Sequence, residues 1–237
     1  MKPTLYQLQL RYFNSLVHKI LLYPLQWLVL LGMRGFMTLV SLTGSIRRTD
    51  IINLLDPAVF KRKSPIIFVA NHQSKYDSFF TIASLSIFHW HLALPVRSML
   101  HPAAFKNIIG RHALLIFGNY PAKPVKNIPY GLEFTKYAMN KGHSIFIFPE
   151  AHRVLPHESQ PRTGIEEMLR AYPHALIVPC HIQWYRDHKN RKRYELTIGE
   201  AYRPKHIDAK RIMKTVYSLP LPSEIEAKAL VEEAQQE

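Results

Sequence analysis

Residues 71–77 read Asn-His-Gln-Ser-Lys-Tyr-Asp, so that His72 and Asp77 lie five positions apart. They follow the apolar run 66–70, which predicts a buried strand. Reactive groups gather beyond the carboxyl ends of parallel strands. A turn into a helix can bring the Asp77 carboxylate against one ring nitrogen of His72, which leaves the other nitrogen free to accept a proton. The segment predicts His72 as a general base with Asp77 as its partner, although such a pair can also be purely structural.

A second polar cluster follows the apolar run 144–148, where Pro149 and Glu150 lead to Arg153. If the two runs form neighbouring strands, Glu150 and Arg153 face the same opening as His72. A guanidinium matches the geometry of a phosphate, which makes Arg153 a candidate for binding an anionic substrate group. An ion pair between Glu150 and Arg153 that only braces the loop is the alternative.

The elements that must position these residues alternate in type from Pro65 onward. Strands are expected at 66–70, 92–96, 114–117, 144–148 and 175–179. Helices are expected between them, at 78–89, 102–109, 128–140 and 164–172. After Pro179, residues 181–185 and 194–200 predict a hairpin around a basic loop. The alternation predicts an α/β fold, with a mostly parallel central sheet flanked by helices.

The first 46 residues form a separate apolar zone. Fourteen uncharged, mostly apolar residues at 20–33 precede Arg34 and a further apolar stretch. A spanning helix needs about 20 apolar residues, and Pro24 and Arg34 both interrupt this one. We therefore expect an N-terminal apolar helical membrane-docking segment, with one helix before Pro24 and one after it, in one leaflet. Helices that belong to the core, or a true span, are the alternatives.

The order and spacing of these clusters resemble the glycerophosphate and lysophospholipid acyltransferase family. Its first motif, Asn-His-x4-Asp, is matched by Asn71, His72 and Asp77. Its third motif, Phe-Pro-Glu-Gly-Thr-Arg, is matched at four places: Phe148, Pro149, Glu150 and Arg153. Gly164 stands where the family has a glycine after that motif, and the run that ends at Pro179 resembles the fourth motif. The resemblance covers roughly residues 60 to 200.

The resemblance implies transfer of a fatty acyl group from a thioester, acyl-CoA or acyl carrier protein, to the hydroxyl of a lysophospholipid-like acceptor. His72 would remove the hydroxyl proton as the oxygen attacks the thioester carbonyl, in phospholipid or glycolipid biosynthesis. No cofactor is implied beyond the thioester co-substrate. The residues with implied substrate-binding roles are Asn71, Glu150, Arg153, Gly164 and Pro179.

With these motifs in place, the chain divides into three parts. We expect an apolar helical membrane-associating segment over 1–48, an α/β acyltransferase domain over 49–205 and a polar helical tail over 206–237.

The chain departs from the family's motifs at two places. Ala151 and His152 replace the Gly-Thr of the third motif. Tyr120 stands where the second motif has an arginine that is thought to help hold the acceptor's phosphate. Three cations near the expected strand ends could supply that charge: Lys123, Lys126 and Arg97. If none does, we expect an acceptor with a smaller or less charged headgroup than lysophosphatidate.

The net charge of the chain limits the kinds of partner that it is expected to bind. The sequence has 31 Lys and Arg against 17 Asp and Glu, a formal net charge of +14. Such a surplus indicates a polyanionic neighbour, either an anionic membrane surface or nucleic acid. The main alternative to an enzyme is thus a non-catalytic basic module that binds one of these. Because no recognised nucleic-acid motif occurs, we expect the membrane and no nucleic acid as a partner.

Other chemistries find less support in the sequence. No His and Cys cluster has the spacing of a structural zinc site, so no metal is expected. A hydrolase on the same scaffold is weakened by the lack of a Gly-x-Ser-x-Gly elbow. The single cysteine, Cys180, excludes an internal disulfide and favours a reducing compartment. We expect a membrane-associated protein on the cytoplasmic face.

Overall fold

The computed structural model describes residues 16–42, 50–56, 58–59, 64–74, 77–87, 90, 93–106, 114–115, 118–123, 131–151, 160–186, 190, 192–225 and 227–228. Within these ranges the strands are β1 (Asp50–Asn53), β2 (Ile66–Ala70), β3 (Val96–Leu100), β4 (Tyr120–Pro121), β5 (Ser144–Ile147), β6 (Leu176–Arg186) and β7 (Lys192–Ile198). They form one sheet in the order β1-β7-β6-β2-β5-β3-β4. Strands β6 and β7 pair antiparallel, and every other neighbouring pair is parallel. This confirms the α/β class with a mostly parallel sheet.

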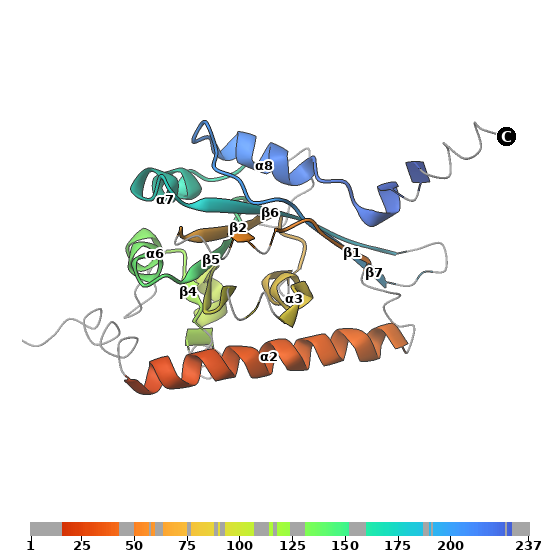
Figure 1. Cartoon of the computed structure of the whole chain (residues 1–237), viewed down its shortest axis with the longest axis horizontal. Helices are drawn as coiled ribbons and strands as arrows, with labels where there is room; N and C mark the ends of the chain where they lie inside the picture. Colours follow the sequence, from red (N-terminus) through yellow and green to blue (C-terminus); the bar gives the residue numbers. More distant parts are fainter. Residues whose placement is uncertain are drawn as a thin grey trace, which may run out of the picture.

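Helices cover both faces of the sheet. The described helices are α2 (Leu16–Leu42), α3 (Asp77–Ser84), the 3-10 helix η2 (Pro102–Phe105), α6 (Gly131–Asn140), α7 (Gly164–Ala171) and α8 (Ala209–Tyr217). Figure 1 shows α3 and then α2 below the sheet, with α7 and α8 above it.

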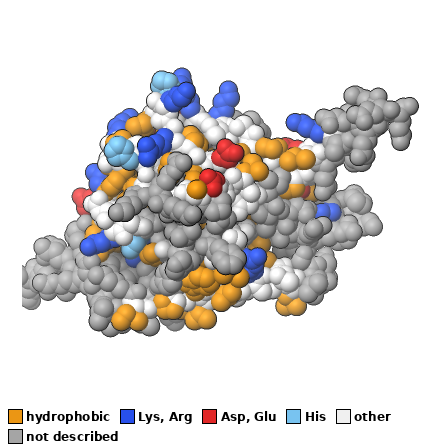
Figure 2. All heavy atoms as spheres, in the orientation of Figure 1, with side chains coloured by type: hydrophobic (Ala, Val, Ile, Leu, Met, Phe, Trp, Pro, Cys, Tyr) orange, Lys and Arg blue, Asp and Glu red, His pale blue; other side chains and the backbone are white. Residues whose placement is uncertain are grey.

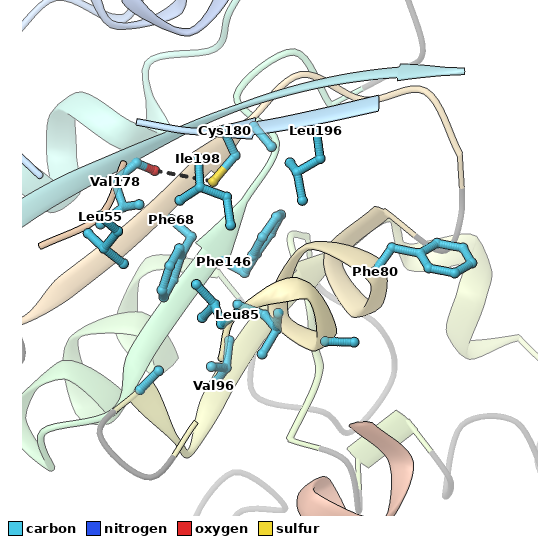
Figure 3. Close-up of a cluster of buried hydrophobic side chains, with 14 of the residues drawn as sticks. Leu55, Phe68, Phe80, Leu85, Val96, Phe146, Val178, Cys180, Leu196 and Ile198 are labelled. Carbon is cyan, nitrogen blue, oxygen red and sulfur yellow. Dashed lines mark hydrogen bonds between the residues drawn. The ribbon is translucent and has the colours of Figure 1, made fainter. Parts of the chain in front are cut away.

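Strand β2 lies at the centre and is buried on both sides. Successive side chains of a strand point to opposite faces. Phe68 and Ala70 accordingly pack in the cluster that includes α2 and α3, while Ile67 and Val69 pack with α6, α7 and α8. Figure 3 shows the first cluster, in which Cys180 is buried. Burial raises the pKa of the Cys180 thiol, which fits a small core residue and not a nucleophile.

The structure shifts some of the predicted elements. Strand β2 has the predicted bounds, whereas β3 begins at Val96, where the predicted strand ended. Pro95 has no N–H for a ladder, and the strand continues instead through the buried Arg97 and Ser98. Residues 114–115 are helical where a strand was predicted. Residues 107–109, 116–117 and 128–130 lie outside the described residues.

Helix α2 is one helix that continues through Pro24, where two were predicted. Proline removes the hydrogen bond to the carbonyl four residues earlier. That carbonyl belongs to Ile20, and both Ile20 and Pro24 are exposed, so no core group loses a partner. No described helix combines the length and hydropathy needed to cross a membrane.

The inner face of α2 is part of the core. Leu30 and Met37 are buried in the cluster shared with α3. The Gln26 amide bonds to both backbone groups of Val96, donating to its carbonyl over 2.8 Å and accepting from its N–H over 3.1 Å. Arg34 donates to the carbonyl of Leu85 over 3.1 Å. These contacts fix α2 to β3 and to the residue just after α3.

Helix α8 also belongs to the core, although the sequence placed it in a polar tail. Asp208 caps its N-terminus by accepting from the backbone of Lys210 over 2.8 Å. Its apolar stripe then packs on the sheet and comprises Ala209, Ile212, Met213 and Val216. A boundary at residue 206 therefore does not separate this helix from the domain.

Candidate active site

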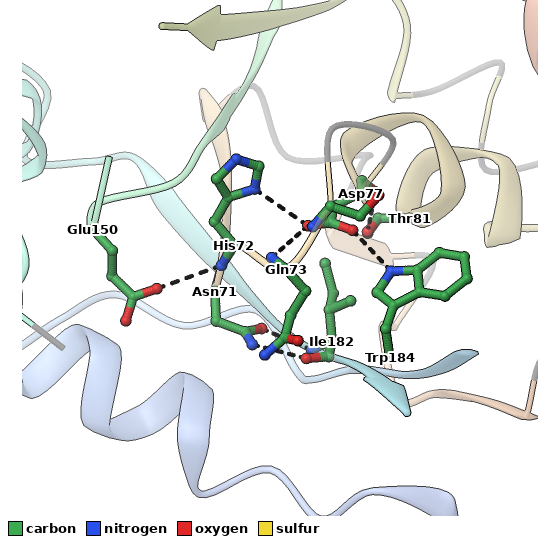
Figure 4. A network of polar contacts seen from close by, with 9 residues as sticks. Asn71, His72, Gln73, Asp77, Thr81, Glu150, Ile182 and Trp184 are labelled. Carbon is green, nitrogen blue, oxygen red and sulfur yellow. Dashed lines mark hydrogen bonds and ion pairs between the residues drawn. The ribbon is translucent and has the colours of Figure 1, made fainter. Parts of the chain in front are cut away.

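His72 and Asp77 meet in the turn between β2 and α3, as the sequence predicted. His72 Nδ1 lies 3.2 Å from Asp77 Oδ2. The aspartate is fully buried, whereas the histidine side chain is 20% exposed. Figure 4 shows the other ring nitrogen pointing away from Asp77. The arrangement orients an imidazole by one nitrogen and presents the second nitrogen at the surface of the site.

Asp77 is held from two directions. Its Oδ2 accepts from the backbone N–H groups of Gln73 and Ser74, over 2.7 and 2.6 Å. Its Oδ1 accepts from the indole Nε1 of Trp184 over 3.1 Å. Asp77 is also the first residue of α3, where the helix dipole favours a negative charge. No local pattern pointed to Trp184 as a site residue, because it lies 107 positions from Asp77.

Glu150 supports the backbone of His72. Its side chain is buried, with 3% of its surface exposed. Glu150 Oε2 accepts from the His72 N–H over 3.4 Å, and Oε1 accepts from the hydroxyl of Tyr217 over 2.5 Å. The ring of Phe148 lies against that of His72, with 4.3 Å between centroids. Arg153 lies outside the described residues, so the ion pair and the phosphate contact predicted for it stay predictions.

Asn71 ties the same turn to the next strand. Its Nδ2 donates to the carbonyl of Ile182 over 2.8 Å, and its Oδ1 accepts from the Ile182 N–H over 2.7 Å. The residue is buried, with 1% exposed. Its amide therefore holds the turn in place, and the substrate contact predicted for it stays a prediction.

The two remaining predicted site residues lie in regular structure. Gly164 is the first residue of α7, and a Cβ added there would meet nothing within 4 Å. Pro179 lies beside Val69 in the sheet, and its carbonyl accepts from Gly199 over 2.9 Å. Neither position shows a polar side chain that could bind a substrate. The substrate-binding roles that the resemblance implies for Gly164 and Pro179 stay predictions.

Ala151 has a left-handed backbone, with φ at 61°. Its N–H donates to the carbonyl of Phe148 over 3.0 Å, which closes the turn after β5. Glycine adopts this backbone without steric cost, whereas an L-residue pays about 1–2 kcal/mol. The turn therefore keeps the conformation that suits the family's glycine despite the departure in sequence.

Tyr120, which stands in place of the family's arginine, packs in the core. Its hydroxyl lies 2.6 Å from Thr135 Oγ1, and burial raises its pKa. Arg97 is buried on the face covered by α6, near the ring of Phe134, and donates to His143 over 3.1 Å. Burial, partly offset by nearby tyrosines, lowers the pKa of Arg97 to about 10. His72 contacts α3 on the other face of the sheet, so the position of Arg97 gives no support for a charge that replaces the family's arginine beside His72.

Lys123 and Lys126 give no further support for a charge that replaces the family's arginine. Lys123 is exposed just after β4, and Lys126 lies outside the described residues.

A small hollow of about 40 Å³ lies between α2, α3 and β3. Four polar residues line it together with apolar side chains: Gln26, Ser78, Ser98 and Asn119. About 10–15 Å³ of such volume holds one water, so the hollow has room for a few waters. Within the described residues, no group of three or more His, Cys, Asp or Glu side chains could hold a metal ion.

The comparison with protein families agrees with the predicted motifs. The pattern of the acyltransferase family matches residues 51–183, which is more than half of the chain. A search of curated proteins found no matching sequence. Among solved structures, the chain is similar to the 1-acyl-sn-glycerophosphate acyltransferase PlsC from Thermotoga maritima, with 15% identity and a TM-score of 0.48, covering 92% of this chain and 98% of that one. The family match includes both His72 and Glu150. The chain thus belongs to the acyltransferase family, as its motifs predicted, and is an acyltransferase.

Proposed function

We propose that this acyltransferase moves a fatty acyl group from a thioester, acyl-CoA or acyl carrier protein, to the hydroxyl of a lysophospholipid-like acceptor. The observation that carries the proposal is the orientation of His72, whose Nδ1 is held by the buried Asp77 while its second nitrogen faces away from that carboxylate. A hydroxyl needs a base to become a good nucleophile, and the orientation of this imidazole supports that role.

The reaction then follows from ordinary acyl transfer. His72 Nε2 takes the hydroxyl proton as the acceptor oxygen bonds to the carbonyl carbon. Asp77 stabilises the imidazolium that forms. The tetrahedral intermediate collapses with cleavage of the carbon–sulfur bond, and the proton on Nε2 passes to the departing thiolate. The products are the ester and the free thiol, and no covalent acyl-enzyme is needed.

The acceptor is proposed to carry less charge than lysophosphatidate. The motif position of the family's phosphate-binding arginine holds Tyr120, which is buried against Thr135. Losing one charge-assisted contact to a phosphate costs about 1.5–3 kcal/mol, or roughly 10- to 150-fold in affinity. A lysolipid with a phosphodiester or neutral headgroup loses less binding free energy when this arginine is absent. This preference is tested by measuring turnover on a panel of acceptors: lysophosphatidate, lysophosphatidylglycerol and neutral glycolipids. Highest turnover on lysophosphatidate contradicts it.

The outer face of α2 is proposed as the membrane contact. Five large apolar side chains are exposed along it: Ile20, Leu28, Leu31, Phe36 and Leu39. Figure 2 shows hydrophobic side chains along the lower edge of the molecule, where Figure 1 places α2. The exposed cations of α8 (Lys210, Arg211 and Lys214) lie on the other side of the sheet. The proposal therefore rests on the apolar face of α2 and not on the basic surface of α8.

The base is tested by substitution at His72. We expect His72→Ala to lower turnover about 10²- to 10⁴-fold, the usual loss for a general base, with an unchanged circular dichroism spectrum. Asp77→Asn is expected to lower kcat as well. His174→Ala, at an exposed turn after α7, is the matched control and should keep full activity. Turnover is measured as thiol release together with the acylated lipid. A folded His72→Ala variant with near-normal turnover rejects the mechanism.

A further inference from the structure

Trp184 reaches the site from the hairpin of β6 and β7. It lies opposite Tyr194, in the part of β6 that extends beyond the parallel sheet. The indole packs against two aromatic rings, Tyr194 with centroids 4.7 Å apart and Phe80 with centroids 5.5 Å apart. Phe80 lies one turn after Asp77 on α3. Aromatic packing thus fixes the plane of the indole, and its N–H is directed at Asp77 (Figure 4).

The two oxygens of Asp77 have different surroundings. Oδ2 has contacts from three donors, the N–H groups of Gln73 and Ser74 and the ring of His72. Within the described residues, the hydrogen bond to Oδ1 comes from Trp184. A carboxylate held at one oxygen can still turn about its last bond, which moves the lone pair that His72 needs. A donor at the second oxygen stops that rotation.

We infer that Trp184 is a positioning residue for acyl transfer, whose indole N–H holds the plane of the Asp77 carboxylate so that Oδ2 faces His72. The inference rests on the proposed roles of His72 and Asp77. Trp184 acts through Asp77 and touches neither the acyl group nor the acceptor in the proposed reaction. Its effect is therefore expected in kcat, while KM for both substrates stays nearly constant.

A different reading is that Trp184 only fills space between Phe80 and Tyr194. A buried indole N–H usually finds an acceptor, so the hydrogen bond alone does not decide between the two readings. Two substitutions separate them. Trp184→Phe keeps an aromatic ring and removes the donor. Trp184→His keeps a ring N–H at the atom equivalent to the indole nitrogen and removes the outer six-membered ring.

We expect Trp184→Phe to lower kcat about 10- to 100-fold, the range for a hydrogen bond to a charged group, with KM changed less than about twofold. Trp184→His should retain more kcat than Trp184→Phe although it packs less well. The same Trp184→Phe change in an Asp77→Asn background should cost less than about threefold, because the carboxylate it orients is already gone. Circular dichroism and thermal unfolding confirm that each variant is folded when its kinetics are measured.

The outcomes separate this inference from the proposed function. Normal kcat for a folded Trp184→Phe, with His72→Ala inactive, overturns the positioning role alone. Equal losses from Trp184→Phe in the wild-type and Asp77→Asn backgrounds also overturn it, since they show a packing effect independent of Asp77. If Trp184→Phe does not fold, Trp184→His decides: near-normal kcat supports the donor, and a loss as large as that of Asp77→Asn overturns it. Near-normal turnover by His72→Ala instead rejects the base, and the positioning role with it.

Discussion

The hydroxyl of Tyr217 donates to the carboxylate of Glu150 over 2.5 Å, although 67 positions separate them in the sequence. The other oxygen of Glu150 accepts from the backbone N–H of His72. Tyr217 is the last residue of α8 and also lies edge-on to His181, with 5.5 Å between ring centroids. The end of α8 therefore supports the strand end that carries the proposed base.

Tyr217→Phe keeps the ring and removes that donor. We expect the free energy of unfolding to fall by about 1–3 kcal/mol, because a buried carboxylate loses a hydrogen bond. We also expect kcat to fall severalfold, since the His72 backbone is less firmly held. Tyr172→Phe is the control, as its hydroxyl bonds to Lys136 and Asn140 on α6, away from the site. Urea unfolding and turnover are measured for both, and equal kcat values for the two variants contradict the support role.

The two faces of α2 can be tested with one pair of leucines. Leu28 is 65% exposed on the outer face, whereas Leu30 is 4% exposed on the inner face. Leu28→Glu should leave the fold intact and weaken binding to lipid vesicles about 10- to 150-fold, the loss from about 1.5–3 kcal/mol of apolar burial. Leu30→Glu should unfold the protein, because it places a carboxylate in the core. Vesicle flotation and thermal unfolding report the two effects. Unchanged flotation of Leu28→Glu argues against membrane contact through this face.

Ala151→Gly should stabilise the turn after β5. The left-handed backbone at φ 61° costs an alanine about 1–2 kcal/mol, and glycine removes that cost. Glycine also raises the conformational entropy of the unfolded chain, which lowers the free energy of unfolding by about 0.4–1 kcal/mol. A net gain of up to about 1.6 kcal/mol in the free energy of unfolding is expected, with full activity. Chemical denaturation measures it, and a loss above about 0.5 kcal/mol shows that the turn is not strained.

The sequence predicted the elements whose pattern is local. The apolar run 66–70 became β2 with unchanged bounds, and the polar turn after it placed His72 beside Asp77 as its spacing suggested. Strand β3 was misplaced because its buried Arg97 and Ser98 look like surface residues. Helix α2 was divided at Pro24 because the sequence does not show that this proline lies on the exposed face.

No local pattern in the sequence predicts the residues that complete the site. Trp184 and Tyr217 resemble ordinary core aromatics until the fold brings them to Asp77 and Glu150. The role of Asn71 was also hidden, since its two partners are backbone atoms of Ile182 on another strand. A motif identifies the residue types at strand ends, whereas the contacts that orient them depend on tertiary packing.

The contacts that fix α2 to the sheet also determine how the site is oriented relative to any surface that α2 binds. Gln26 bonds to the backbone of β3, and Arg34 bonds to the residue just past α3, so the helix has little freedom to roll. A surface that binds the outer side chains of α2 then sets both the height and the tilt of His72 above that surface. If α2 is the membrane contact and His72 the base, as proposed, an acceptor lipid must rise to this fixed level before its hydroxyl can react.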